Sequence, residues 1–276
     1  MAALLALGSA ISFGVADIIG AVASRRISAV WVSLALQVTG LPVLAFALVL
    51  LPGRPSLPAF ALGALAGTGG IIGLVLYLRS LAVGPVGVIS PVAALVGAAV
   101  PVGWGVLLGG DQLARSEVVG VLLGLVAVVL VAWSPDASTR AYGRRGPLFA
   151  VLAGTTFGLY FVILDATPPD SGVWPLVSSR FAGIVVLIAA LLVVRRPAPG
   201  RRLLPLLVVG GLADSLATLL FLLATRTGLL SIVALLASLS PVVALVLARF
   251  VLQERLTGLQ ATGVGAALLA TLLIVV

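Results

Sequence analysis

The second half of the chain repeats the first, and each copy contains an odd number of apolar segments long enough to cross a membrane. A copy with an odd number of crossings must enter the membrane from the opposite side the second time. Many secondary transporters use such an inverted pair to build two interconvertible faces around one site. The repeat therefore predicts two inverted halves and points to transport. The matched pairs are Phe13 and Gly14 with Phe157 and Gly158, Trp31 with Trp174, Gly40 with Gly183, Gly67 with Gly210, Gly84 with Gly228, Asp111 with Glu254, Leu113 with Leu256, and Gly120 with Gly263.

The composition places the chain in lipid. Apolar residues make up 62%, charged residues only 9%, and the mean hydropathy is +1.32. A soluble domain carries about 25% charged residues. The apolar runs are continuous and are interrupted after roughly twenty residues, the length that a membrane-spanning helix needs, and they lack the alternation of barrel strands. We expect an all-α integral membrane protein with ten transmembrane helices, near 2–23, 29–51, 57–83, 86–109, 117–134, 147–166, 173–194, 203–227, 230–252 and 258–276.

The predicted domain boundary is the longest linker, SPDASTRAYGRRGP. It separates a first five-helix repeat at 1–134 from a second at 147–276, with an inter-repeat loop at 135–146. The other connections are too short to hold a soluble catalytic domain. The first segment has no basic region before it and no convincing cleavage site, so we interpret it as a retained span and not as a signal peptide.

Several residue types are missing, and their absence excludes functions. The chain has no cysteine and no histidine, which argues against disulfides, thiolate metal sites and the usual zinc ligand. No phosphate-binding loop or nucleophile motif is visible, so we expect neither a cofactor, a metal nor ATP-driven pumping. The positive charge behind the net +8 comes from arginine alone, and almost all of the arginines lie at segment ends. This favours membrane orientation over nucleic-acid binding. The bias toward Ala, Leu, Val and Arg suggests a GC-rich genome, hence a bacterial inner (plasma) membrane.

Two segments carry a family resemblance. The fourth span and its exit read ISPVAALVGAAVPVGWGVLLGGDQLARSEVVGVLLG, and the ninth reads LASLSPVVALVLARFVLQERLTGLQATGVGAAL. A Pro-Val inside an apolar helix, a carboxylate at its end, then Leu and a Gly-bearing last helix resemble the EamA domain. That domain occurs twice in transporters of the drug/metabolite transporter superfamily. The second half fits better, because Asp111 stands where glutamate is usual. The resemblance implies ten helices in two inverted repeats, a central cavity lined by the first, third, fourth, sixth, eighth and ninth spans, and export.

The orientation in the membrane has two readings. The positive-inside rule places the arginine-rich ends of the spans in the cytoplasm, which would put both termini outside. The resemblance implies both termini inside. Arg54, Arg115 and Arg226 belong to the arginine-poor ends. The arginine-rich ends carry Arg25, Arg26, Arg79, Arg140, Arg144, Arg145, Arg195, Arg196, Arg201, Arg202, Arg249 and Arg255.

Prolines inside two spans predict kinks and gating positions. Pro91 and Pro101 fall in the fourth span and Pro241 in the ninth. A proline within a helix removes a backbone hydrogen bond, and the freed carbonyl is tolerated in a membrane only against protein or a wet cavity. The fourth and ninth spans are therefore expected to line the interior.

Ionisable residues at membrane depth are the candidate binding residues, because they are costly there. Asp214, beside Ser215, lies near the middle of the eighth span and would bind a cationic group or a coupling proton. The alternative is a structural pair with Arg180. Arg180 matches Gln37 of the other copy and could hold a substrate carboxylate or phosphate through its planar fork. Asp17 is either a cavity residue or an interfacial carboxylate.

Four aromatic residues complete the predicted site: Phe13, Tyr77, Phe157 and Tyr160. Aromatic faces attract cations and stack on rings, although for any one aromatic residue packing against a neighbouring helix is the more common role. The leading hypothesis is a secondary transporter that moves a small polar metabolite or drug, amino-acid-like or an organic cation, with possible coupling to protons. The alternatives are a membrane-embedded enzyme acting on a lipid-linked substrate and a passive channel. The expected partners are a small-molecule substrate, coupling protons and the lipid bilayer, with the chain a monomer or a homodimer.

Overall fold

A computed structural model describes residues 1–83, 86–132, 145–194, 200–251 and 258–275, and these residues form helices without any strand. The predicted inter-repeat loop falls almost wholly outside them. The α-helices are α1 (Ala2–Ser24), α2 (Ala29–Thr39), α3 (Leu41–Leu50), α4 (Leu57–Val83), α5 (Val86–Leu107), α6 (Arg115–Ala132), α7 (Arg145–Asp165), α8 (Trp174–Val194), α9 (Leu204–Thr225), α10 (Leu230–Ala237), α11 (Ser240–Val251) and α12 (Gly258–Val275), with short 3-10 turns η1 (Pro169–Ser171) and η2 (Arg201–Leu203).

The helices have the length and surface of membrane spans. Six segments in the described part of the chain are long and apolar enough to cross a membrane: Ala2–Ser24, Ala29–Leu50, Leu57–Ala82, Leu148–Asp165, Trp174–Val193 and Leu204–Thr225. Large apolar side chains such as Phe46, Phe181 and Val193 lie on the outside. A continuous apolar exterior is stable against lipid and unstable in water. The chain is therefore a multi-pass, all-helical membrane protein.

Two predicted spans each consist of two helices. The second span changes from α2 to α3 at Gly40, just before Pro42, and the ninth changes from α10 to α11 at Ser238 and Leu239. Proline lacks the backbone donor that a helix interior needs, so it fits best in the first turn of a new helix. Pro241, where a kink was predicted, is the second residue of α11 and directly follows this break.

The fourth span, unlike the second and the ninth, is a single helix. α5 is one continuous helix that contains both Pro91 and Pro101. Each proline removes a single ladder hydrogen bond, and the remaining bonds of the helix carry it through both positions.

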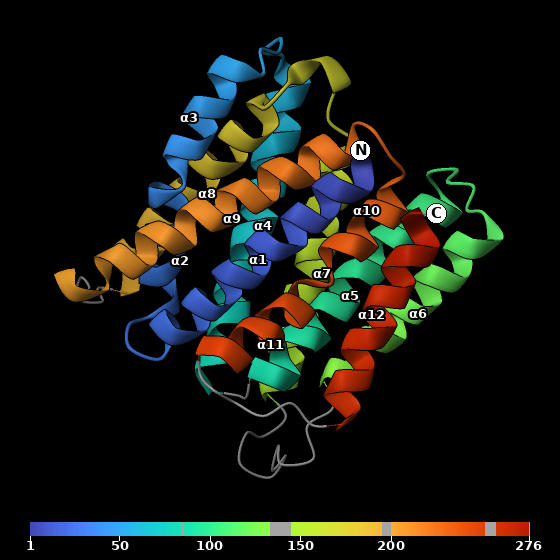
Figure 1. Ribbon diagram of the computed structural model, residues 1–276. Helices are drawn as coiled ribbons and strands as arrows, with labels where there is room; N and C mark the ends of the chain where they lie inside the picture. Colours follow the sequence, from blue (N-terminus) through green and yellow to red (C-terminus); the bar gives the residue numbers. More distant parts are fainter. Residues whose placement is uncertain (84–85, 133–144, 195–199, 252–257, 276) are drawn as a thin grey trace.

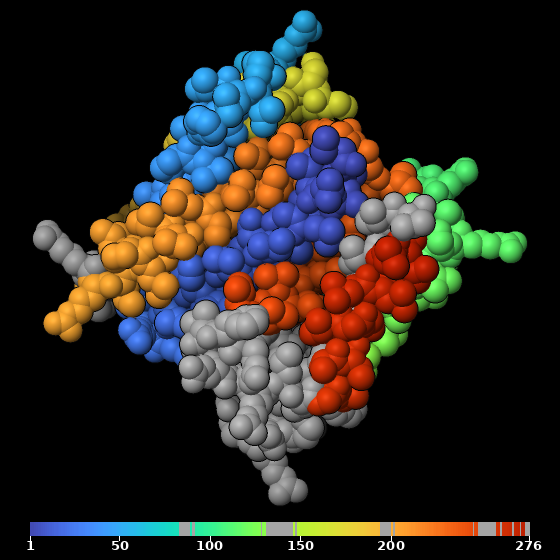
Figure 2. Space-filling model, viewed as in Figure 1, coloured from blue at the N-terminus to red at the C-terminus, as the bar shows by residue number. Residues whose placement is uncertain are grey.

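The two halves of the chain interleave. α1 packs along α9, α10 and α11, while α7 packs along α4 and α5, and α6 packs against α12. Figure 1 shows α1 running between α9 and α11, and in Figure 2 the blue N-terminal helix is wedged between the orange and red segments of the second half. Helices of the first half thus find their main partners in the second half, so the halves form one core.

Glycines allow the closest helix crossings. An added Cβ on Gly14 of α1 would lie 2.8 Å from Val243 of α11, and one on Gly158 of α7 would lie 2.5 Å from Val100 of α5. An added Cβ on Gly67 of α4 would lie 2.5 Å from the Cα of Ser179. Small residues let helix backbones approach in lipid, where no hydrophobic force drives helices together. The matched glycines of the two repeats therefore mark the crossings between the halves.

Candidate functional site

A central cavity of about 150 Å³ lies between the two halves of the chain. Its wall contains residues of α1, α4, α5, α7, α9, α10 and α11, as the predicted lining requires. It also contains residues of α2 and α8, which the family resemblance does not place on the wall, although Gln37 and Arg180 on these helices are predicted site residues. These two helices contribute Gln37 and Arg180 at the level of the cavity. Apolar side chains dominate the wall, and the polar ones gather in two places.

The first polar place is a buried cluster around Arg180, whose exposed fraction is only 5%. Its Nη1 lies 2.8 Å from Oδ2 of Asp214 and also donates a hydrogen bond to Oε1 of Gln37. Its Nη2 donates to Oγ1 of Thr218 at 3.5 Å, and Thr218 donates in turn to the backbone oxygen of Asp214 at 3.2 Å. The cluster joins α8 and α9 of the second half to α2 of the first.

This arrangement offsets the charge of Arg180 inside the protein. A buried ion is tolerated when it is paired and its remaining donors are hydrogen-bonded. Arg180 and Gln37, which occupy equivalent positions in the two repeats, are therefore direct partners. Asp214 was expected either to bind a cationic group or a proton, or to pair with Arg180. In the structure it forms the ion pair with Arg180 and also lies on the cavity wall.

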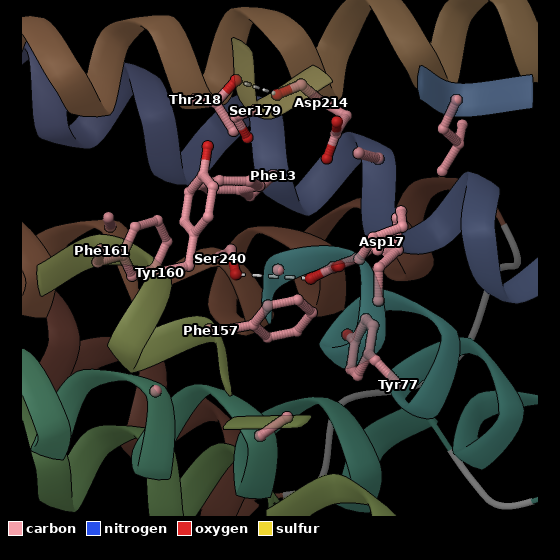
Figure 3. A pocket seen from close by; sticks show the side chains of 18 of the residues that line it. Phe13, Asp17, Tyr77, Phe157, Tyr160, Phe161, Ser179, Asp214, Thr218 and Ser240 are labelled. Carbon is pink, nitrogen blue, oxygen red and sulfur yellow. Dashed lines mark hydrogen bonds between the residues drawn. The ribbon is translucent and has the colours of Figure 1, made fainter. Parts of the chain in front are cut away.

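The second polar place surrounds Asp17 on α1. Its Oδ2 accepts a hydrogen bond of 3.5 Å from the hydroxyl of Ser240 on α11. Phe13 lies one helical turn earlier and on the same face of α1. Tyr77 and Phe157 pack edge to face with their ring centres 5.8 Å apart, and Figure 3 shows them beside Asp17. A carboxylate and aromatic rings thus share one part of the wall.

Tyr160 lies between these two places. Its ring contacts that of Phe161 at a centroid distance of 5.5 Å, and its hydroxyl points toward Ser179 (Figure 3). Gly70 of α4 leaves room for this ring, because an added Cβ there would lie 2.9 Å from Cδ2 of Tyr160. The absence of a side chain at Gly70 therefore leaves the space that the Tyr160 ring occupies on the cavity wall.

One predicted site residue does not line the cavity. Ser215 is fully buried on another side of α9, where its Oγ faces Gly40 at the junction of α2 and α3. Neighbouring residues of a helix point about 100° apart, and here Ser215 points toward the α2–α3 junction while Asp214 points into the cavity. The remaining predicted residues do line it: Asp214, Arg180, Asp17, Gln37, Tyr77, Tyr160, Phe13 and Phe157.

The sequence reasoning left out most of the lining residues, among them four polar or aromatic ones on α7, α8, α9 and α11. Phe161, Ser179 and Thr218 lie on helices that carry predicted site residues, and Ser240 begins α11. Thr218 is one helical turn after Asp214, so the helical repeat alone would have identified it. The other three give no such signal, because an aromatic or a serine beside a candidate residue has no fixed direction until its helix is placed.

Comparisons with known proteins agree with this fold. Residues 144–276 match the model of the EamA-like transporter family. A solved structure, described only as "Crystal structure of protein", has the same fold with a TM-score of 0.72 over 99% of this chain and 96% of that chain. Because the sequences are 19% identical, this likeness shows the fold alone, but it includes the first half. No curated protein matches the sequence.

Proposed function

We propose that the chain is a secondary carrier and a membrane transporter of the drug/metabolite transporter superfamily, because residues 144–276 match the model of the EamA-like transporter family. In this proposal two inverted five-helix repeats, 1–134 and 147–276, expose the central cavity alternately to the two sides of the membrane. Export is the proposed direction. The ten crossings count α2 with α3 as one span and α10 with α11 as another.

The packing of the helices supports the inverted repeat. α1 packs on α9 and α11, whereas α7, the equivalent of α1, packs on α4 and α5, which are the equivalents of α9 and of α10 with α11. The partners are exchanged between the halves, as a two-fold axis requires. Gly14 and Gly158 make the corresponding crossings with α11 and α5. A scaffold of this kind can exchange the conformations of its halves and so open on either side.

The observation that carries the proposal is the cavity itself, because its wall comes from both halves. Rocking one half against the other would change access to this space without requiring a channel through either half. The Arg180 cluster, which joins α8 and α9 to α2, lies on the wall and so at the boundary between the halves.

The size and lining of the cavity favour a particular substrate class. An apolar cavity of this volume in another protein holds a molecule the size of benzene. Aromatic faces attract cations, and Asp17 and Asp214 add carboxylates to the wall. We therefore propose a small substrate with one ring-sized apolar part and an ammonium group, which both amino-acid-like molecules and organic cations can carry. The same carboxylates are the proposed binding groups for a coupling proton.

Three molecules with the same phenyl ring and a similar short side chain test this substrate class. Phenethylammonium carries an amine, phenylalanine an amine and a carboxylate, and 3-phenylpropanoate a carboxylate alone. With purified protein in proteoliposomes, we expect saturable uptake of at least one of the two amines and none of 3-phenylpropanoate. Preference for 3-phenylpropanoate would contradict the proposed class, because it would make Arg180 the main substrate contact.

Replacement of Asp17 by asparagine is expected to raise the KM for the transported amine about tenfold or more, because a hydrogen bond to a charged group is lost. The measurement is initial uptake rate against amine concentration. Asp170→Asn is the matched control, since it removes the same charge from an exposed turn outside the cavity. If Asp17→Asn kept the KM of the unmodified protein, Asp17 would not contact the amine.

A further inference from the structure

Arg226 follows directly after α9 and fastens this helix end to the end of α7. Its Nη1 donates hydrogen bonds to the backbone oxygens of Asp165 at 3.3 Å and Thr167 at 2.8 Å. Its Nη2 donates to Oγ1 of Thr167 at 2.5 Å and to the backbone oxygen of Pro168 at 3.4 Å. Thr167 is 2% exposed. The guanidinium group thus binds the last carbonyl of α7 and the start of the connection to α8, loop 166–173.

The far side of loop 166–173 is fastened as well. The backbone nitrogen of Arg54 donates to the backbone oxygen of Asp170 at 2.8 Å, and Nε1 of Trp174 donates to that of Gly53 at 3.2 Å. Gly172 has φ +55°, and an added Cβ on Gly53 would lie 2.5 Å from its nitrogen. Loop 166–173 is therefore held between the α3–α4 connection and the end of α9.

These contacts lie beyond one end of the cavity. α7 reaches from Phe157 and Tyr160 on the cavity wall to Asp165 under Arg226, and α9 reaches from Asp214 to Arg226. Between the two levels lie buried apolar side chains of one cluster, among them Leu164, Phe221, Leu222 and Val233. Arg226 thus lies beyond a layer of buried apolar side chains, which stands between the cavity and the arginine-poor end of the bundle.

The repeat does not duplicate this guanidinium group. By the register that matches Gly228 with Gly84, the equivalent of Arg226 in the first half is Ala82. In an inverted repeat the two halves exchange roles when the open side changes. A latch present in only one half stabilises closure of one end without a counterpart in the other half, so it biases the equilibrium between the two states.

We propose that Arg226 is a gate residue, which keeps the arginine-poor end of the transporter closed by binding loop 166–173 to the end of α9. This rests on the proposed alternating-access function. Opening at this end requires the four hydrogen bonds of Arg226 to break together, because α7 and α9 must separate there. Arg226 acts by positioning the helix ends and does not touch the substrate. Its removal shifts the population toward the state that is open at this end.

The chain contains no cysteine, so a single introduced cysteine reports access to the cavity. Ala94→Cys places a thiol on the cavity wall. A membrane-impermeant maleimide is applied to sealed vesicles from the side of the arginine-poor end, which Asp170→Cys identifies. Adding Arg226→Ala is expected to raise the labelling rate of the Ala94→Cys protein from this side about tenfold or more, as the loss of hydrogen bonds to a charged group allows. Arg226→Lys is expected to give a smaller rise, since an ammonium keeps the charge but not the planar fork.

The control is Arg115→Ala, which removes an exposed arginine from the same end of the bundle. It should leave the labelling rate unchanged. Thr167→Val removes one acceptor of the latch while keeping its shape, so it tests the gate if Arg226→Ala fails to fold. Unchanged labelling in Arg226→Lys and Thr167→Val, or an equal rise in Arg115→Ala, would overturn the gate. A failure of the gate can be told apart from a failure of the carrier proposal, because the carrier proposal is tested by transport and counterflow in the unmodified protein.

Discussion

Replacing Arg180 with alanine is expected to abolish transport and to reduce the free energy of unfolding by about 3–5 kcal/mol, because it leaves a carboxylate without its partner inside the protein. Asp214 lies 2.8 Å from the guanidinium and is mostly buried. Gln37 and Thr218 lose their partner in the same substitution. The unfolding temperature of the protein in detergent and the uptake rate in proteoliposomes give the two readouts.

The double variant Arg180→Gln with Asp214→Asn separates a structural pair from two independent residues. If the ion pair holds α8 against α9, neutralising both partners should restore much of the stability that either single change removes, because no uncompensated charge remains. Arg202→Ala serves as the control for the loss of positive charge, because Arg202 is exposed at the arginine-rich end of the bundle. Additive losses in the double variant would contradict the structural role of the pair.

The second large effect is expected at Gly67, where α4 crosses α8. Gly67→Ala should lower the free energy of unfolding by about 1–3 kcal/mol, the usual cost of overfilling a packed interior. The added methyl group would meet backbone atoms of Ser179, which cannot move aside as a flexible side chain would. Transport should fall with stability, because Ser179 and Arg180 on α8 line the cavity.

Gly69 supplies a control on the same helix. An added Cβ there meets nothing within 4 Å. Alanine favours a helix interior over glycine by about 0.5–1 kcal/mol, so Gly69→Ala should be neutral or stabilising in thermal unfolding. If the two alanine variants unfolded at the same temperature, the close crossing of α4 and α8 would not be important for stability.

The sequence predicted much of the fold because lipid imposes a simple rule on each span. The predicted segment 57–83 coincides with α4, and the segment 173–194 differs from α8 by one residue. The resemblance to the EamA domain is confirmed over residues 144–276. The break at Gly40 was not predicted, although Pro42 just after it favours the start of a new helix. The close approach of Ser215 from α9 to Gly40 is a contact between distant parts of the chain.

For the candidate site, the sequence could predict which helix positions are polar, but not how their side chains meet. Asp214, Arg180 and Gln37 stood out because ionisable and amide side chains are costly in a membrane. Ser215 was grouped with Asp214 but does not line the cavity, and the sequence alone does not reveal this, because the direction of a side chain depends on the rotation of its helix. That Arg180 binds Gln37 and Asp214 together follows only from the contact of α2, α8 and α9. The membrane-spanning helices were thus readable from the sequence, whereas the assembly of their polar residues was not.

Counterflow in proteoliposomes tests the central claim most directly. Vesicles are loaded with a high concentration of the unlabelled amine that the protein transports, and the labelled amine is added outside at a low concentration. A carrier that alternates between two states exchanges one for the other, so we expect the label to accumulate transiently above its external concentration. A flux that rises linearly with concentration and shows no such accumulation would contradict alternating access and identify a passive channel.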